Sequence, residues 1–522
     1  MPRQRTIFSR KNVLSRTFIA PDDGRLSLIR RDITGGINNR QHPTMIGENM
    51  AQSLTNVDLS IPGERSMRKG STLIEDLGAN AITGMAAYDP QGATDNLLVT
   101  EGVNLKRWAG SGSFATVYSS FTSGLPTTII KAYRSGTGDV ALVSNGTDNV
   151  LQMDSSYATS DLGDTSTSCP KTTVLTSYRN RVWALKDELL YFSDNSTVTF
   201  DRTTNNYRIP CGDERALLGT RDLGLLIVGQ DQIWALNPSV TPVATDKPEK
   251  LSEYGCASGN TFQQVGDDYY YLSYDGVRAL RRTELDKLQY GQSYPISYVL
   301  KDEFSEINWA HIEKACAVYW DNKYFISLPT AGSSYNNKVW IYFPATQGWS
   351  VISGWNVATW AKFKVGGEEL LYAGEASANG LVYRAWSGFT DNGTAISYAE
   401  EGRSEDLGQQ LIKKNGGHVK VVGKPTGNYN IGVYASFDGG GYQLLGHMNT
   451  SSNLITFPTT FPVLFYPDAR VFKTFSLDSY GPWYTISIKI SFSDTVSSAD
   501  NITIYETSIT ANADEYIDEE EA

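Results

Sequence analysis

The chain has 522 residues, a length at which two or three structural units are expected rather than one compact core. Its hydrophobic fraction of 40% and charged fraction of 20% are typical of a globular protein, and 47 Gly and 30 Tyr with few helical patterns favour an all-β fold. A net charge of −12 argues against a general nucleic-acid binder, which usually carries a basic surface.

The first 31 residues differ in charge from the rest of the chain. They contain eight Arg and Lys residues against two Asp residues, a net of +6, which leaves −18 for the remainder. Apolar residues between the arginines follow neither a helical nor a strand period, so we expect residues 1–34 to form an extended basic arm that orders against a partner. We assign partner docking to Arg3, Arg5, Arg10, Lys11, Arg16 and Arg25. A contact with nucleic acid and a plain disordered terminus are the alternatives.

Residues 35–72 form an opening segment rich in turn signals. It contains Gly35-Gly36-Ile37-Asn38, Pro62-Gly63 and Arg68-Lys69-Gly70. Between these turns, the pattern from Glu48 to Leu54 is compatible with a short helix.

Seven times after this segment the sequence repeats a short apolar strand, a polar turn and a second apolar strand. The starts recur about every 40–55 residues, the range of propeller blades. A closed ring of blades leaves only short, protected strand edges and a central channel. We therefore predict a β-propeller of six or seven blades over residues 35–394, in which the first and last hairpins could complete one split blade. The hairpins are Leu97–Val99 with Leu105–Trp108, Val140–Val143 with Val150–Met153, Val182–Leu185 with Leu189–Phe192, Leu225–Val228 with Ile233–Leu236, Tyr269–Ser273 with Val277–Leu280, Tyr324–Leu328 with Val339–Phe343, and Leu370–Ala373 with Leu381–Tyr383.

Tryptophans recur in or near these hairpins, and we interpret them as core packing between blades rather than as a ligand site. They are Trp108, Trp183, Trp234, Trp320, Trp340 and Trp386.

The pattern changes after Gly388 to long alternations of apolar and polar residues. Tyr429 to Phe437 and Tyr484 to Phe492 each place apolar side chains on one face only. Such period-two segments are strands with one buried face, so residues 395–507 are predicted to form a β-sandwich. Residues 508–522 are predicted to be an acidic, disordered tail.

No catalytic, cofactor-binding or metal site is predicted. Four widely spaced cysteines are expected to be buried free thiols, and the four histidines are scattered without a zinc-binding spacing. The nearest match to a sialidase Asp-box, Ser436 to Gln443, lies outside the blades and has Gln443 where an aromatic residue belongs. No apolar run reaches the roughly 20 residues that span a membrane, and no secretory signal is recognisable.

The stretch from Gly35 to Gly70 resembles the opening of the nozzle proteins, also called tail tubular protein B, of short-tailed double-stranded DNA phages. The order of the later parts is similar as well: blades, a strand leading to Asp406-Leu407-Gly408, the pair Lys413 and Lys414, and a sandwich. The arm of residues 1–34 is longer and more basic than the family pattern.

The resemblance implies a structural protein of the virion tail, assembled in the host cytoplasm. It implies a ring of commonly six copies below the portal and adaptor proteins, with tail fibre or spike proteins around it. The ring would retain the packaged genome and conduct double-stranded DNA without sequence recognition. Gly-rich loops are candidates for narrowing the channel, and we assign this role to Gly439, Gly440, Gly441, Tyr335 and Asn336.

Two other classes of function remain open. A receptor-binding or carbohydrate-binding tail protein would use Tyr and Trp in the blade loops to stack on sugars. A cellular propeller scaffold would be expected to show more regular blade motifs and no adjoining sandwich. Oligomeric state separates the three, because a nozzle is expected to be hexameric or dodecameric, a fibre trimeric and a scaffold monomeric.

Overall fold

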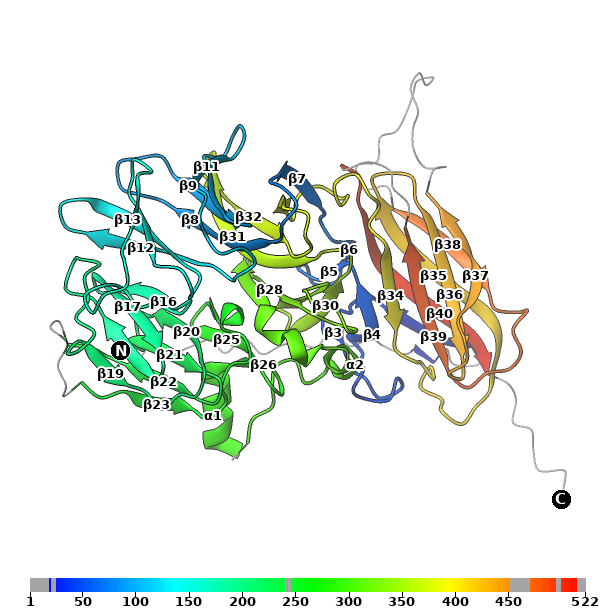
Figure 1. Ribbon diagram of the computed structural model, residues 1–522. Helices are drawn as coiled ribbons and strands as arrows, with labels where there is room; N and C mark the ends of the chain where they lie inside the picture. Colours follow the sequence, from blue (N-terminus) through cyan, green and yellow to red (C-terminus); the bar gives the residue numbers. More distant parts are fainter. Residues whose placement is uncertain are drawn as a thin grey trace, which may run out of the picture. The chain divides into compact units, whose positions relative to one another are not determined.

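A computed structural model of the chain describes residues 18–19, 25–239, 242, 246–290, 292–450, 470–493 and 499–513. The chain divides into two compact units, each built almost wholly from strands (Figure 1). The sandwich unit combines Met1–Arg68, Ala345–Ser350 and Thr394–Ala522, and the propeller unit combines Lys69–Pro344 and Val351–Gly393. In the chain, the propeller unit is thus inserted between the two ends of the sandwich unit.

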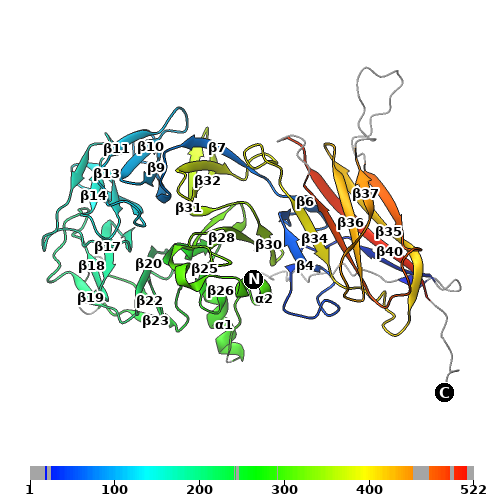
Figure 2. The ribbon, with the colours of Figure 1, turned by 45° about the vertical axis from the view of Figure 1, so that its right-hand side comes forward.

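In its described residues, the propeller unit contains seven groups of neighbouring antiparallel strands arranged as blades (Figure 2). All seven predicted hairpins are present as neighbouring antiparallel strands, which confirms the repeat. In chain order, the blades contain β8 (Ile82–Tyr88), β9 (Asn96–Glu101), β10 (Asn104–Trp108) and β11 (Ala115–Tyr118); β12 (Thr128–Arg134), β13 (Gly138–Ser144), β14 (Leu151–Met153) and β15 (Thr159–Asp161); β16 (Leu175–Tyr178), β17 (Arg181–Lys186), β18 (Leu189–Phe192) and β19 (Asn206–Arg208); β20 (Glu214–Gly219), β21 (Leu225–Gly229), β22 (Ile233–Leu236) and β23 (Glu249–Ser252); β24 (Gln263–Val265), β25 (Asp268–Ser273) and β26 (Gly276–Ala279); β27 (Cys316–Trp320), β28 (Lys323–Leu328) and β29 (Lys338–Phe343); and β31 (Val357–Val365), β32 (Glu368–Glu375), β33 (Leu381–Ala385) and β7 (Ser71–Asp76).

The ring is closed by a split seventh blade. Strand β7 precedes all other blade strands in sequence, yet it pairs with β33, from Ser71 opposite Ala385 to Asp76 opposite Leu381. The first strand of the last blade, β31, lies beside the first strand of the first blade, β8. The described part of the propeller therefore has seven blades, and the split blade is formed by the start and the end of the repeat region.

The cores of the blades are apolar and aromatic, as the sequence predicts. Trp108 packs on Phe114 with 5.7 Å between ring centroids and meets Tyr372 of the last blade edge-on, also at 5.7 Å. Of the six recurrent tryptophans, Trp108, Trp183, Trp340 and Trp386 are buried and the other two are half-buried. Close packing between neighbouring blades is therefore what these residues supply.

The fifth blade is a separate sheet of three strands. Its last strand, β26, leads directly into the helix α1 (Leu280–Tyr290). The following loop covers the free edge of β26, since Ile296 N–H donates to the carbonyl of Val277 at 2.8 Å and the Ser297 hydroxyl accepts from Val277 N–H at 2.8 Å. The remaining short helices are η1 (Gly259–Thr261), α2 (Lys301–Ser305) and η2 (Trp309–Lys314). Among the described residues, no helix is both long and apolar enough to cross a membrane.

The sandwich unit contains two sheets, which we call sheet 1 and sheet 2. Sheet 1 has the order β1-β2-β40-β35-β38, with β6 also paired to β40 and β5 paired to β6. In sheet 2, β4, β34, β39, β36 and β37 are successive antiparallel neighbours, and β3 pairs with β4 in parallel. The strands are β1 (Phe18–Ile19), β2 (Arg25–Arg30), β3 (Gly36–Ile37), β4 (Met50–Thr55), β5 (Val57–Asp58), β6 (Arg65–Met67), β34 (Tyr398–Gly402), β35 (Lys414–Pro425), β36 (Asn430–Phe437), β37 (Gln443–Asn449), β38 (Val471–Ser476), β39 (Ile486–Phe492) and β40 (Ile502–Ala513); β30 (Gly348–Ile352) begins in the part of the chain assigned to this unit.

Several predicted boundaries differ from those observed. Residues 35–68 group with the sandwich unit rather than with the blades, and the predicted helix at Glu48 to Leu54 is instead strand β4, from Met50. Residues 25–30 are not part of a free arm, because they form β2, which pairs with β40 along its whole length. Residues 508–513 belong to β40 and not to the acidic tail. Each error has the same cause: the pairing partner lies hundreds of residues away and leaves no local signal.

Candidate functional site

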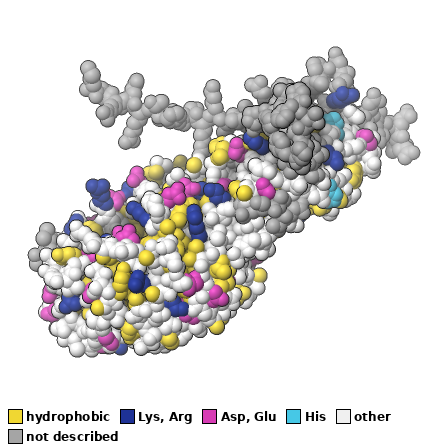
Figure 3. Space-filling view, turned by 90° about the horizontal axis from the view of Figure 1, so that it is seen from above, with side chains coloured by type: hydrophobic (Ala, Val, Ile, Leu, Met, Phe, Trp, Pro, Cys, Tyr) yellow, Lys and Arg dark blue, Asp and Glu magenta, His cyan; other side chains and the backbone are white. Residues whose placement is uncertain are grey.

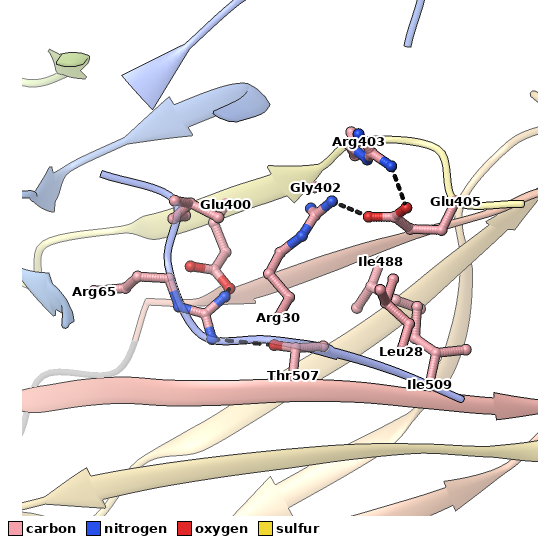
Figure 4. Close-up of a pocket in the computed structure, with 11 residues that line it drawn as sticks. Leu28, Arg30, Arg65, Glu400, Gly402, Arg403, Glu405, Ile488, Thr507 and Ile509 are labelled. Atoms are coloured by element: carbon pink, nitrogen blue, oxygen red, sulfur yellow. Dashed lines mark hydrogen bonds and ion pairs between the residues drawn. The ribbon is translucent and has the colours of Figure 1, made fainter. Parts of the chain in front are cut away.

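A small cavity lies between the two sheets of the sandwich unit and is lined by buried and half-buried charged side chains (Figure 4). Its volume is about 20 Å³, room for about one water molecule. Sheet 2 contributes Glu400, Gly402 and Ile488, and Glu405 follows strand β34 of that sheet. Leu28, Arg30, Ile33, Arg65, Arg403, Thr507 and Ile509 complete the lining. We call the five charged members the ionic cluster.

One half of the ionic cluster is centred on Glu405. Arg30, on strand β2 of sheet 1, donates from Nη2 to Glu405 Oε1, and Arg403 donates from Nη2 to Glu405 Oε2 at 2.8 Å. The backbone of Glu405 is held by a pair of hydrogen bonds with Ile486 of strand β39. Arg403 is fixed further by donation from Nη1 to the carbonyl of Ile46 at 2.9 Å. A single carboxylate therefore accepts from two guanidinium groups and joins the two sheets.

The other half is centred on Glu400. Arg65, on strand β6, donates from Nη1 to Glu400 Oε1 at 3.1 Å and from Nη2 to the hydroxyl of Thr507 at 3.2 Å. The hydroxyl of Tyr398 donates to Glu400 Oε2 at 2.7 Å. The side chains of Arg65 and Glu400 are 2% and 5% exposed, so this ion pair is shielded from solvent. All four carboxylate oxygens of the ionic cluster thus accept a hydrogen bond.

The burial of these groups changes their protonation behaviour. Burial lowers the pKa of Arg30, and although Glu405 raises it, the nearby charges of Arg403 and Arg65 lower it further. Burial also lowers the pKa of Arg403, but the hydrogen bond and charge of Glu405 outweigh burial, so the net shift is upward. Burial, followed by the charge of Glu400, raises the pKa of Tyr398 far above its ordinary value. Tyr398 therefore acts as a neutral hydrogen-bond donor.

Gly402 leaves space beside Arg30 at the cavity. A Cβ at this position would lie 2.8 Å from Arg30 Nη1 and 3.3 Å from the carbonyl oxygen of Ile488. The backbone of Gly402 is fixed, because its carbonyl accepts from Gln52 Nε2 at 2.6 Å and from the Ser487 hydroxyl at 2.8 Å. Any larger residue at position 402 would press on the Arg30 guanidinium.

The chemistry available here is charge pairing and hydrogen bonding. The lining offers guanidinium donors and acceptors but no cysteine, histidine or lysine. In the part of the chain that the structure describes, no group of His, Cys, Asp and Glu residues could hold a metal ion. The four cysteines are buried free thiols, as predicted.

Of the predicted docking arm, residues 1–34, the structure describes only residues 18–19 and 25–34. Arg3, Arg5, Arg10, Lys11 and Arg16 lie outside the described residues. Arg25 is exposed at the start of β2, where its backbone pairs with Asn512 of β40. Arg30, which the sequence places in the same basic stretch, is the residue that enters the ionic cluster. Its partner Glu405 is 375 positions away, and no signal in the sequence links the two.

The predicted channel loops belong to different units. Gly439, Gly440 and Gly441 form the exposed turn between β36 and β37 in the sandwich unit. Tyr335 and Asn336 lie between β28 and β29 in the propeller unit, and only Tyr335 is exposed there. Asn336 is buried and donates from Nδ2 to the carbonyls of Lys314 at 2.7 Å and Val357 at 2.8 Å. These bonds hold the Asn336 side chain in the core, so of the two residues only Tyr335 is available at the surface of this loop.

The two lysines of the sequence resemblance differ in their surroundings. Lys414 is fully buried at the start of β35 and donates from Nζ to the carbonyls of Gln409 and Tyr484. Burial lowers the pKa of Lys414, with Asp406 and Asp438 opposing this shift. Lys413 places its ammonium 5.7 Å from the ring centroid of Tyr484. The pair fixes the segment before β35 to the loop before β39.

A second feature, on the propeller unit, is a group of exposed aromatic side chains near α1, which we call the aromatic surface. Tyr274 lies in the turn between β25 and β26, is 47% exposed and stacks on Trp309 with 5.7 Å between ring centroids. Tyr294 and Tyr298, in the loop that covers β26, contact each other at 4.7 Å and are 54% and 41% exposed. Sequence analysis considers tyrosines and tryptophans in the blade loops in general but does not single out these residues.

The comparisons with known proteins give a distant likeness only. No protein-family model and no curated protein matches the chain. A crystal structure of BBS1N in complex with ARL6DN has a TM-score of 0.38 at 12% identity, covering 61% of this chain and 97% of that chain. The extracellular domain of the hybrid two-component system BT3049 from B. thetaiotaomicron has a TM-score of 0.39 at 13% identity, covering 60% of this chain and 42% of that chain. This chain therefore spans less than half of the second structure, and likeness of this degree does not extend to function.

Proposed function

We propose that the chain is a structural component of the tail of a short-tailed phage, a nozzle subunit that assembles into an oligomeric ring. The observation that supports this proposal is the close backbone packing around two glycines in the stretch that resembles the family. Gly36 has a φ of +76°, and a Cβ there would lie 2.2 Å from the backbone nitrogen of Trp349. A Cβ on Gly70 would lie 2.0 Å from the carbonyl oxygen of Thr390. Gly36 and Gly70 thus occupy positions where no side chain fits, as expected if the motif specifies a shared fold.

The charge of the protein suits a conduit for DNA. Duplex DNA carries one negative charge per ~1.7 Å of axis, so a strongly basic tube would bind it and slow its passage. The chain has a net charge of −12, and on the face seen in Figure 3 basic and acidic side chains are interspersed rather than gathered into one basic patch. We expect DNA to pass such a surface without sequence recognition.

The proposal includes the partners that the resemblance implies. The subunits would form a ring, commonly of six copies, through two different complementary patches on each subunit. Portal and adaptor proteins would contact the ring on the capsid side, and tail fibre or spike proteins would surround it. The ring would retain the packaged genome until infection and conduct it during ejection. No enzymatic activity is part of the proposal.

Electron microscopy of the purified full chain, with mass photometry on the same sample, tests this proposal. Sixfold rings with a central hole wide enough for duplex DNA would support it. Trimers would contradict it. A variant lacking residues 1–17 is the matched sample, because loss of the ring in that variant would assign the basic segment to assembly.

The aromatic surface favours a second candidate function, binding of a carbohydrate receptor by a tail protein. Rigid Tyr and Trp side chains supply large contact area at low entropic cost. A glycan array probed with the full chain tests this candidate, with Tyr274→Ala as the variant and Tyr133→Ala, another tyrosine of similar exposure, as the control. Binding that Tyr274→Ala abolishes and Tyr133→Ala retains would favour the receptor function, and no binding by the unaltered chain would reject it.

A further inference from the structure

The ionic cluster has more hydrogen-bond donors than acceptors. Both oxygens of Glu400 and both oxygens of Glu405 already accept hydrogen bonds. Arg30 has five N–H donors, yet Glu405 is the acceptor that it reaches among the described residues. The Nε of Arg403 is buried and has no hydrogen-bond partner in the described part of the chain. The cavity is therefore bordered by guanidinium donors without acceptors.

The charges that line the cavity are also unequal. Three guanidinium groups, from Arg30, Arg65 and Arg403, face two carboxylates. Glu48 and Asp406 act on Arg403 from a distance, but neither lines the cavity. Because burial of a charge without a partner is costly, a cavity lined in this way favours a group that carries negative charge and accepts several hydrogen bonds.

Space for such a group exists beside Arg30. The cavity has a volume of about 20 Å³, above the ~10–15 Å³ that one water molecule needs. Gly402 keeps this space open, since a Cβ there would lie 2.8 Å from Arg30 Nη1. Leu28, Ile488 and Ile509 form the apolar part of the wall, which strengthens any electrostatic interaction inside it.

We propose that this cavity is a binding site for a small monovalent inorganic anion of the size of chloride, held by Arg30 and Arg403 between the two sheets of the sandwich unit. The anion would accept from the free donors of both guanidinium groups and balance the third positive charge. It would act as a structural ligand that links β2 to the segment after β34. This inference does not depend on the proposed tail function.

Bromide is the probe that tests the site directly, because its anomalous scattering distinguishes it from water. Crystals of the full chain soaked in sodium bromide should show an anomalous peak in the cavity, within contact distance of Arg30 and Arg403. Gly402→Ala should remove the peak, since the added methyl group occupies the space next to Arg30. Gly441→Ala is the matched control, because a Cβ at that exposed glycine would contact nothing within 4 Å.

A measurement in solution distinguishes a specific binding site from the alternative outcome, an adventitious ion only, in which the ion binds in the crystal without stabilising the protein. The melting temperature of the full chain should rise as sodium chloride replaces sodium gluconate at constant ionic strength, and above the dissociation constant the rise should follow the logarithm of the chloride concentration. Arg30→Gln and Gly402→Ala should lose this chloride-dependent rise, and Gly441→Ala should keep it. The proposal is overturned if the cavity holds only water in the bromide crystals. It is equally overturned if a bromide peak appears without any chloride-dependent shift of the melting temperature, or if Gly402→Ala responds to chloride as the unaltered chain does.

Discussion

Removal of the Glu405 carboxylate should destabilise the sandwich unit strongly. The side chains of Arg30 and Glu405 are 11% and 6% exposed, and Glu405 also accepts from Arg403 at 2.8 Å. Loss of one partner from a buried pair costs about 3–5 kcal/mol, because the remaining charge stays buried without compensation. Glu405→Ala leaves two guanidinium groups without their carboxylate, so we expect a loss of stability in the upper part of this range. Domains are stable by about 5–15 kcal/mol in total, which makes this a large fraction.

Urea unfolding followed by pulsed hydrogen exchange measures this loss of stability for the sandwich unit alone, with peptides from β2 and β34 as reporters. At a urea dependence of about 2 kcal/mol per molar, a loss of about 4 kcal/mol moves the midpoint by roughly 2 M. Glu506→Ala is the matched control: its ion pair with Arg31 is more exposed, at 64% for the arginine, and such pairs contribute less than about 1 kcal/mol. A shift for Glu405→Ala no larger than that of the control would refute the reasoning.

Three further predictions concern the propeller unit. Gly70→Ala should destabilise the junction before β7, because its Cβ would lie 2.0 Å from the carbonyl oxygen of Thr390, and faster hydrogen exchange in β7 would report this change. Burial raises the pKa of Asp148, but hydrogen bonds, chiefly from Thr122, outweigh burial and lower the pKa overall. The stability that Asp148 contributes is therefore present above about pH 4 and is lost as the pH falls through its folded pKa. Asp148→Asn should flatten the acid side of a plot of melting temperature against pH, and an unchanged plot would contradict this role. Burial raises the pKa of the Cys316 thiol to about 12. A thiol reagent at pH 8 should therefore label Cys316 only when the protein unfolds. Rapid labelling of Cys316 in the native protein would contradict its burial.

Sequence analysis succeeds here where the signal is local. The seven blade hairpins follow from strands of four to seven residues separated by turns such as Asn145-Gly146 and Asp275-Gly276, and both partners of each hairpin lie within one short stretch. Strand β7 has no such neighbour in the sequence, and only its pairing with β33 shows that it completes a seventh blade.

The ionic cluster could not be predicted for the same reason. In the sequence, Arg30 resembles one more basic residue of a polar arm, and Glu400 and Glu405 resemble ordinary polar residues in or near a strand. Only the pairing of β2 with β40, and the facing of sheet 1 and sheet 2, brings these side chains together. The partners of the two ion pairs are separated by 335 and 375 positions, beyond the reach of any periodicity argument.

The pairing of β2 with β40 has a consequence for synthesis on the ribosome. Residues 25–30 leave the ribosome early, but their partner strand begins at residue 502. At about 5–20 residues per second, the nascent β2 waits roughly 25–100 s before β40 exists. During that interval the blades can close their ring, since β33 follows β7 within the first 385 residues. Co-translational folding should therefore complete the propeller before the sandwich. Strand β2 can already pair with β1, but it must stay soluble without its second partner until residues 502–513 have been made.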